Sequence, residues 1–418
     1  MPLDIPVLVQ HYRISCQGCE YKRLVAPSST RIPTDFTSPI KNMSPNFKVI
    51  ARTGEPILHL EDFCLPESPV HDEDTGATWF TDIPRSVIYG FNVGEGRKSL
   101  NRIEVGDLVG CLALIDGDKE HLAVGAKRGF GKVNIETGKL EYINTLFPGD
   151  KDKQDLMRIN DGAVDVQGRF WAGSMRSFDL GPPENEGTLF RSDPTTHLNH
   201  VKYPVAIPNG IGFSPDNSTL YLVETQLKTI FAYRFEPETG GISHEQEFVK
   251  FDEEKHGPGA PDGLAISSDG DLWVAMLGGY KVLRIDPKTK DVKGIIEVPT
   301  SKQVACPAFV GEGIVITTGK LVQLDPDIAK TSVHAGAVFY VPLPGITGRE
   351  VYKARFDAVP EDPGTTSGKL ISASKAKEKK EEDATLTGIA VPPVAEKPSV
   401  STMTTVDATT ATRVTGEK

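Results

Sequence analysis

The chain has 418 residues, of which 38% are hydrophobic and 25% are charged, and its formal net charge is −11. This composition is typical of a soluble globular protein, and no apolar run is long enough to cross a membrane. The excess of acidic over basic residues, 57 against 46, argues against a nucleic-acid-binding protein.

The N-terminal residues and the cysteines indicate a cytoplasmic protein. The first residues have no basic stretch followed by an apolar run, so we expect no signal peptide. The five cysteines are few and odd in number, which favours a reducing compartment over a disulfide framework. Cys16 and Cys19 form one CxxC pair, but no second pair or histidines stand at zinc-site spacing, and we interpret them as two ordinary thiols.

Three regions follow one another along the chain. Residues 1–48 carry prolines at nearly even spacing and predict an irregular N-terminal arm. Residues 49–356 alternate short runs of β-branched and aromatic residues with Gly, Asp, Asn and Pro turns, which predicts an all-β domain. Residues 357–418 contain no aromatic residue and many charged, Ser, Thr and Pro residues, which predicts a disordered polar tail.

The central region contains a repeat. A turn rich in Asp and Gly, followed by a strand with a large residue at its centre, recurs six times at intervals of roughly 50 residues. The central residues are Phe80, Leu122, Trp171, Tyr221, Trp273 and Val315. Six such units with about four short strands each predict a six-bladed β-propeller. The alternative, two stacked β-sandwiches, would not need a regular period.

Oxygen-bearing side chains stand at equivalent places in the repeats, before the predicted inner strands. They are Glu67, Asn160 or Asp161, Asn209 and Asp262. Equivalent positions in different blades face one axis, so these oxygens could bind Ca²⁺, Mg²⁺ or Mn²⁺, and less typically Zn²⁺. Asn-Gly and Asp-Gly are also common turn pairs, and either Asn160 or Asp161 could be the equivalent residue in the third repeat.

Several segments resemble the senescence marker protein (regucalcin), gluconolactonase and related lactonase family over residues 60–345. They are Glu67–Val70, Arg158–Gly162, Gly168–Met175, Pro208–Gly210 and Pro261–Gly263. The resemblance implies a six-bladed propeller with one divalent metal ion in its channel. It also implies that Glu67, Asn209 and Asp262 bind the metal, that Arg158 and Asn160 bind substrate, and that Asp262 is the catalytic acid/base.

Other candidate residues fit structural roles better. Residues 176–186, which include Glu184 and Glu186, would form a substrate loop but have no clear counterpart in the family. Ser174 stands outside any GxSxG motif and at a predicted strand end, so we interpret it as structural. His71 and His256 lie near the candidate site without a metal-binding motif, and we interpret them as ordinary loop histidines.

The hypothesis from these residues is a metal-dependent hydrolase of a sugar lactone or similar cyclic ester. The metal ion would polarise the carbonyl oxygen, and Asp262 would take a proton from the attacking water. One alternative is a propeller enzyme that acts on another ester, an organophosphate or a C–N or C–C bond. The other is a non-catalytic calcium-binding or scaffold propeller. The expected partner is a small molecule, and the sequence does not define the oligomeric state.

Overall fold

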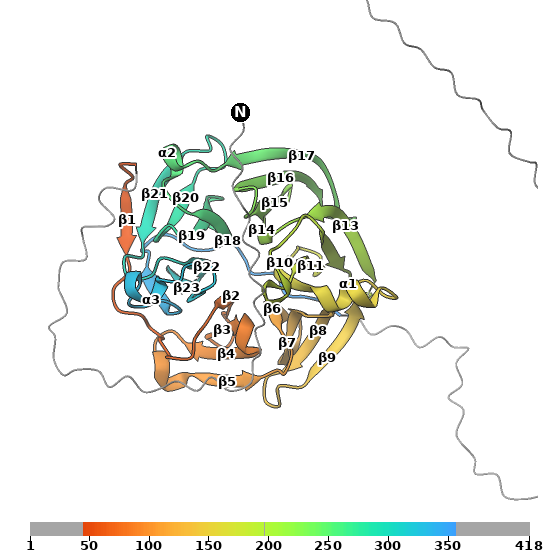
Figure 1. Cartoon of the computed structure of the whole chain (residues 1–418). Coiled ribbons are helices and arrows are strands. Elements are labelled where there is room, and N and C mark those ends of the chain that lie inside the picture. Colours follow the sequence, from red (N-terminus) through yellow and green to blue (C-terminus); the bar gives the residue numbers. More distant parts are fainter. Residues whose placement is uncertain (1–44, 196, 357–418) are drawn as a thin grey trace, which may run out of the picture. The chain divides into compact units, whose positions relative to one another are not determined.

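The computed structural model describes residues 45–195 and 197–356 of the chain (Figure 1). These residues form 24 strands and a few short helices, and the strands surround a common centre. The predicted six-bladed β-propeller is therefore confirmed. The tail 357–418, the arm up to residue 44, and Cys16 and Cys19 lie outside the described residues, so the predictions made for them stay predictions.

The strands fall into six sheets, and each sheet is one blade. Blade 1 contains β2 (Pro66–Asp72), β3 (Ala77–Asp82), β4 (Val87–Asn92) and β5 (Asn101–Glu104). Blade 2 contains β6 (Val109–Ile115), β7 (Asp118–Ala126), β8 (Gly129–Asn134) and β9 (Leu140–Thr145). Blade 3 contains β10 (Met157–Val164), β11 (Phe170–Arg176), β12 (Gly187–Ser192) and β13 (Leu198–Val205).

The second half of the ring follows the same plan. Blade 4 contains β14 (Pro208–Phe213), β15 (Thr219–Glu224), β16 (Thr229–Glu236) and β17 (Gly241–Lys250). Blade 5 contains β18 (Ala260–Ile266), β19 (Leu272–Leu277), β20 (Lys281–Ile285) and β21 (Val292–Glu297), with β1 (Val49–Arg52) parallel to β21. Blade 6 contains β22 (Val304–Phe309), β23 (Gly313–Thr318) and β24 (Val338–Pro342).

The helices are short and lie between strands. The α-helices are α1 (Lys151–Leu156), α2 (Glu253–His256) and α3 (Ile328–Thr331). The 3₁₀ turns are η1 (Ile83–Arg85), η2 (Gly96–Ser99) and η3 (Phe178–Leu180). Among the described residues, no helix has the length and apolar character needed to cross a membrane.

The core lies between the blades. Six of the hydrophobic clusters each combine side chains from two neighbouring blades, and the predicted central residues of the second strands are all buried in them or beside them. For example, Trp171 of blade 3 packs with Phe213 of blade 4, with ring centroids 6.0 Å apart. A single blade has two apolar faces, so the packing of neighbours on both sides explains why the blades form a closed ring.

The ring closes through residues from both ends of the domain. In blade 6, Leu58 pairs with Val338 of β24, and two backbone hydrogen bonds of 3.1 and 2.8 Å join them. A segment before the first blade thus takes the edge position of the last blade. Blade 6 has three strands, not the expected four, because only the short pairing of Leu58 occupies its edge. Blade 5 has five strands because β1, from before the first repeat, is added beside β21.

The innermost strands line the centre and contact one another around the ring. They are β2, β6, β10, β14, β18 and β22, and each contacts the next, with β22 contacting β2. The pairing of each inner strand with its neighbour shifts register near its first residues. In β2, β10, β14, β18 and β22, two residues then oppose one residue of the second strand, which is a β-bulge.

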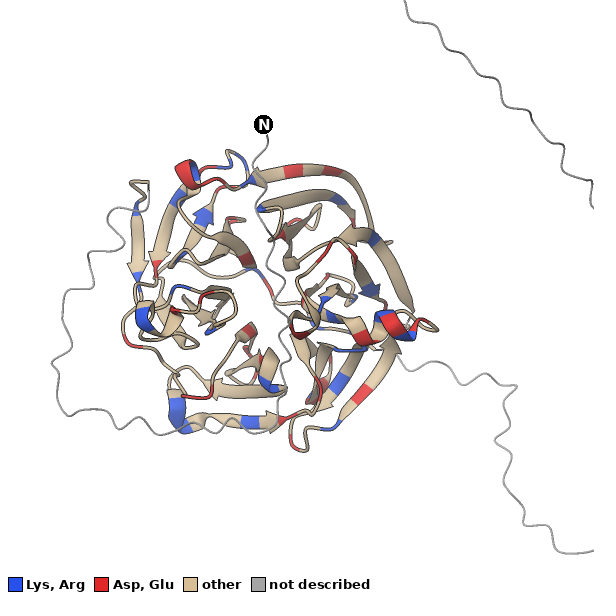
Figure 2. Ribbon diagram, viewed as in Figure 1, with Lys and Arg blue, Asp and Glu red and all other residues tan. Residues whose placement is uncertain are grey.

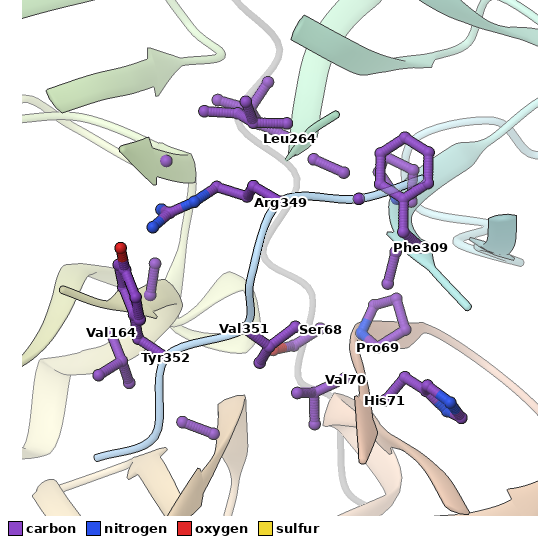
Figure 3. A pocket seen from close by; sticks show the side chains of 18 of the residues that line it. Ser68, Pro69, Val70, His71, Val164, Leu264, Phe309, Arg349, Val351 and Tyr352 are labelled. Atoms are coloured by element: carbon purple, nitrogen blue, oxygen red, sulfur yellow. The ribbon is translucent and has the colours of Figure 1, made fainter. Parts of the chain in front are cut away.

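A segment after the last strand crosses one mouth of the channel. Residues 345–356, here called the strap, run past the turns that follow the inner strands. Backbone hydrogen bonds join Arg349 to Ile266 (3.0 Å), Ala354 to Leu114 (2.7 Å) and Arg355 to Gly168 (2.9 Å). Between the strap and the inner strands lies a cavity of about 240 Å³, and Figure 3 shows Arg349, Val351 and Tyr352 across it from Val70 and Leu264. No repeat or motif in the sequence pointed to this segment.

Gly110 offers a test of how tightly the inner strands pack. A Cβ atom at this position would clash with the carbonyl oxygens of Ile159 and Asn160 in β10, and these backbone atoms cannot move aside. We expect Gly110→Ala to lower the free energy of unfolding by about 1–3 kcal/mol. Gly54→Ala is the matched control, because no atom lies within 4 Å of the added Cβ. Denaturant unfolding of both variants measures the difference, and equal stabilities would contradict the packing.

Candidate functional site

The residues predicted from the sequence lie together at the start of the inner strands. Glu67, Arg158, Asn160, Asn209 and Asp262 are all buried, with exposures between 3% and 9%. They come from β2, β10, β14 and β18, which surround the channel. Figure 2 shows acidic positions on β2 and β18 beside the centre of the ring. Polar side chains that are this deeply buried next to an axis need a partner, which marks the place as a candidate site.

Three carboxyl groups interact across the channel. Burial is the main cause that raises the pKa of Glu67 to about 8, and the charge of Asp161 adds to it. Burial also raises the pKa of Asp161 to about 6. The pKa of Asp262 is raised well above its usual value by burial and then by the charges of Glu67 and Asp161. The three groups therefore resist being charged together in the absence of a cation.

Arg158 is the cation nearest to these carboxyl groups. Burial lowers the pKa of its guanidinium to about 10, although Glu67 and Asp179 act in the opposite direction. Its Nη1 donates to the carbonyl oxygen of Ile159 (2.9 Å) and to Oδ1 of Asn160 (2.8 Å). Its Nε and Nη2 donate to no residue in the described part of the chain, so they remain available to a ligand.

The amide of Asn160 connects Arg158 with Asn209. Its Nδ2 donates to Oδ1 of Asn209 (2.8 Å) and to the carbonyl oxygen of Pro208 (2.9 Å). A predicted substrate residue and a predicted metal ligand are therefore in direct contact. Asp262 differs from both, because its carboxylate accepts no hydrogen bond from the described residues.

The structure shows which of Asn160 and Asp161 is equivalent to the predicted ligands of the other blades. Both lie in the bulge of β10, where Ile159 pairs with Ser174 and Gly162 pairs with Ala172. Asn160 occupies the register position that Asn209 and Asp262 occupy in β14 and β18. Asp161 is the second bulge residue. The charge of its carboxylate raises the pKa values of Glu67 and Asp262, and the residue also lines the cavity beside the strap. Both residues thus belong to the site, which the sequence alone did not reveal.

The open mouth of the channel carries the loop after β11. Phe178, in η3, lies with its ring centroid 5.4 Å from the guanidinium carbon of Arg158, and Asp179 contributes to the electrostatics of that guanidinium. Neither residue was identified from the sequence, because no spacing rule links this loop to β10. Glu186 and Glu184 pair with Arg176 within the same loop, so their carboxylates hold the loop together.

The residues interpreted as structural have structural contacts. The hydroxyl of Ser174 accepts from the backbone N–H of Thr188 (3.0 Å) and is fully buried. His71 Nδ1 lies 3.0 Å from the Thr78 hydroxyl, and His256 Nδ1 accepts from the backbone N–H of Asp252 (3.1 Å). Cys306 is buried, and burial and the nearby carboxylates raise the pKa of its thiol well above the usual value, so it stays protonated.

The residues present fit a divalent cation. Three carboxylates and one guanidinium leave an excess of two negative charges when all are ionised, which one divalent cation would balance. The donors are carboxylate and amide oxygens, the type that Ca²⁺, Mg²⁺ and Mn²⁺ prefer. In the described residues, no three His, Cys, Asp or Glu side chains are grouped as ligands of a metal ion. The predicted ligand set instead combines two carboxylates with an amide.

Comparisons with known proteins place the chain in one family. Residues 65–320 match the SMP-30/Gluconolactonase/LRE-like region. The chain is 30% identical over 282 residues to the Bacillus subtilis protein named "Putative sugar lactone lactonase YvrE", covering 67% of this chain and 91% of that protein. It is 30% identical over 291 residues to regucalcin of Oryctolagus cuniculus, covering 68% and 93%.

A solved structure shows the same fold. The calcium-binding protein regucalcin from Agrobacterium tumefaciens superposes with a TM-score of 0.63 and 21% identity, covering 74% of this chain and 99% of that chain. At this identity the likeness concerns the fold alone.

The raised pKa values predict how stability depends on pH in the metal-free protein. A carboxyl group with a higher pKa in the folded chain loses stabilising free energy as pH rises from its unfolded to its folded pKa. For Glu67 this window runs from 4.5 to about 8. With chelator present, we expect Glu67→Gln to raise the melting temperature over wild type by about 5 °C at pH about 8.5, and much less at pH about 5.

The control is Glu136→Gln, which removes an exposed carboxylate. Its melting temperature should follow that of wild type at both pH values. A Glu67→Gln curve that ran parallel to wild type across the window would show that the carboxyl group is not perturbed by burial.

Proposed function

The chain belongs to the SMP-30/gluconolactonase/LRE-like family, and we propose that it is a divalent-metal-dependent hydrolase that opens a sugar lactone or similar cyclic ester. The observation that carries the proposal is the group formed by Glu67, Asp161 and Asp262 beside Arg158 in the channel of the propeller. The relative named as a sugar lactone lactonase supports the substrate class.

Glu67, Asn209 and Asp262 would hold the cation, and Asp161 would add a nearby negative charge. Ca²⁺, Mg²⁺ and Mn²⁺ suit these oxygen donors, and Zn²⁺ is the less typical choice. A bound divalent cation supplies Lewis-acid stabilisation of the charge that develops on the lactone carbonyl oxygen. The name of the Agrobacterium neighbour describes a calcium-binding protein, which supports a cation of this type.

Asp262 would act as base and then as acid. Its carboxylate has no hydrogen-bond donor among the described residues, so an oxygen is available to accept a proton from the attacking water. The water oxygen bonds to the carbonyl carbon, and the ring C–O bond breaks. Asp262 then returns the proton to the departing ring oxygen, which leaves a hydroxy acid. Water and lactone thus account for all atoms of the product.

Arg158 and Asn160 would orient the substrate. The free Nε and Nη2 groups of Arg158 can donate to substrate oxygens, while Nη1 is held by Asn160. Phe178 lies against the guanidinium and limits its movement. Because the strap crosses the other mouth, we expect substrate to enter and product to leave past this loop.

Removal of the cation or of Asp262 tests the reaction. We expect chelator to abolish hydrolysis of aldonolactones and added Ca²⁺, Mg²⁺ or Mn²⁺ to restore it. Asp262→Ala should lower kcat by about a thousandfold or more, because both the proton acceptor and a cation ligand are lost. Activity is measured by pH-indicator titration of the acid released. Full metal-dependent activity in Asp262→Ala would show that the assignment is wrong.

Arg158 tests the substrate contact separately. We expect Arg158→Ala to raise KM about tenfold to a hundredfold with a smaller change in kcat, because a charged hydrogen bond to substrate is lost. Arg234→Ala, which removes an exposed arginine, should leave both constants unchanged. An unchanged KM of Arg158→Ala across several lactones would remove Arg158 from the pocket.

Two measurements on the wild-type protein distinguish the alternative functions. A panel of lactones, aryl esters and organophosphates distinguishes a lactonase from another hydrolase on this fold. A non-catalytic cation-binding propeller would gain thermal stability from the cation and turn over none of these substrates.

A further inference from the structure

We propose that Thr225 is a positioning residue that sets the orientation of the Asn209 amide and links Asn209 to the bulge of β18 that carries Asp262. The role in cation binding rests on the function proposed above, whereas the contact itself does not. Thr225 directly follows β15 and is buried, with 8% exposure. It lies between two bulges that hold predicted cation ligands.

Two hydrogen bonds define the position of the Thr225 side chain. Nδ2 of Asn209 donates to its hydroxyl oxygen at 2.7 Å. The hydroxyl donates to the carbonyl oxygen of Pro261, also at 2.7 Å. Pro261 directly precedes Asp262, so a single hydroxyl group joins the side chain of one predicted ligand to the backbone beside another.

The direction of these hydrogen bonds follows from chemistry. The carbonyl oxygen of Pro261 can only accept, so Thr225 must use its one hydroxyl proton there. The hydroxyl oxygen then accepts from Asn209, which requires the NH₂ end of the amide to face Thr225. The carbonyl end, Oδ1, must therefore face the other way.

The hydrogen bonds on the opposite side of Asn209 require the same orientation of its amide. The carbonyl oxygen of Pro208 can only accept, so Nδ2 of Asn160 faces it and also reaches Oδ1 of Asn209. An amide oxygen has two lone pairs, and Asn160 uses one. The second lone pair of Oδ1 stays available to a cation, which an NH₂ group could not bind.

Loss of the Thr225 hydroxyl would remove one of the hydrogen bonds that fix the orientation of the Asn209 amide. The two ends of an amide have nearly the same shape, so only hydrogen bonds decide which end faces the channel. Without the hydroxyl, Nδ2 of Asn209 would be buried with no acceptor, and turning the amide would present N–H groups to the cation. The link to Pro261, and hence to the Asp262 bulge, would be lost as well.

The first experiment measures Ca²⁺ affinity by titration calorimetry at neutral pH, together with lactone hydrolysis at saturating Ca²⁺. We expect Thr225→Val, which keeps the shape, to weaken Ca²⁺ binding about tenfold. Thr225→Ser keeps the hydroxyl and should bind within about twofold of wild type. Thr318→Val is the matched control, because it removes a buried hydroxyl that donates to the carbonyl oxygen of Ala337 (2.8 Å).

The comparison with the control separates positioning from general destabilisation. Thr225→Val and Thr318→Val should both lower the melting temperature, but only Thr225→Val should weaken Ca²⁺ binding. Equal Ca²⁺ affinities of these two variants, or a Thr225→Ser variant as weak as Thr225→Val, would overturn the proposal.

A second measurement does not depend on the cation. In metal-free protein, we expect Thr225→Val to lower the melting temperature clearly less in an Asn209→Ala background than in wild type, because the two residues share one hydrogen bond. Melting-temperature losses that add within about 1 °C would show that the residues are not coupled and would overturn the proposal. A wild-type protein that binds no divalent cation and opens no lactone would overturn the proposed function instead, while this cycle still decides on the Thr225–Asn209 contact.

Discussion

Burial of Glu67, Asp161 and Asp262 within reach of one another is electrostatically unfavourable, and packing between the blades has to hold them there. The pKa values of all three groups are raised, with burial as the main cause and like charge as a further one for Glu67 and Asp262. Arg158 balances only part of that charge. A ring of six rigid interfaces can keep such groups together because no blade can move without disturbing two hydrophobic layers.

The bulges of the inner strands explain how the polar side chains of the site come to face the channel. A strand without a bulge would direct alternate side chains into the blade interfaces and leave few toward the channel. In β10, β14 and β18 the extra residue breaks this alternation where Asn160, Asn209 and Asp262 stand. Hydrogen bonds through Asn160 and Thr225 then join three blades, so the polar groups form one connected network.

The two mouths of the channel differ in the side chains that surround them. Turns surround one mouth and the strap crosses it, and apolar side chains such as Val70 and Leu264 line the cavity there. Loops before the inner strands and the loop with Phe178 surround the other, next to Arg158. Polar groups that can bind a cation and an oxygen-rich ligand therefore lie on the side of Arg158 and Phe178, away from the apolar cavity under the strap, and the proposed reaction would occur on that side.

The architecture could be predicted from the residues alone, because a repeat of about 50 residues with strand-forming centres is a local property of the chain. It also indicated Glu67, Asn209 and Asp262 near the starts of their inner strands, although Glu67 pairs with Thr81 one position before the bulge, whereas Asn209 and Asp262 lie in the bulges of their strands. Their roles stay predictions. Four features became visible only in the folded chain: Asp161 lies beside Asn160 at the site, Leu58 pairs with blade 6, the strap crosses the channel, and Thr225 contacts Asn209. Each of these depends on strand register or on contacts between distant segments, and no local pattern of residues specifies such contacts.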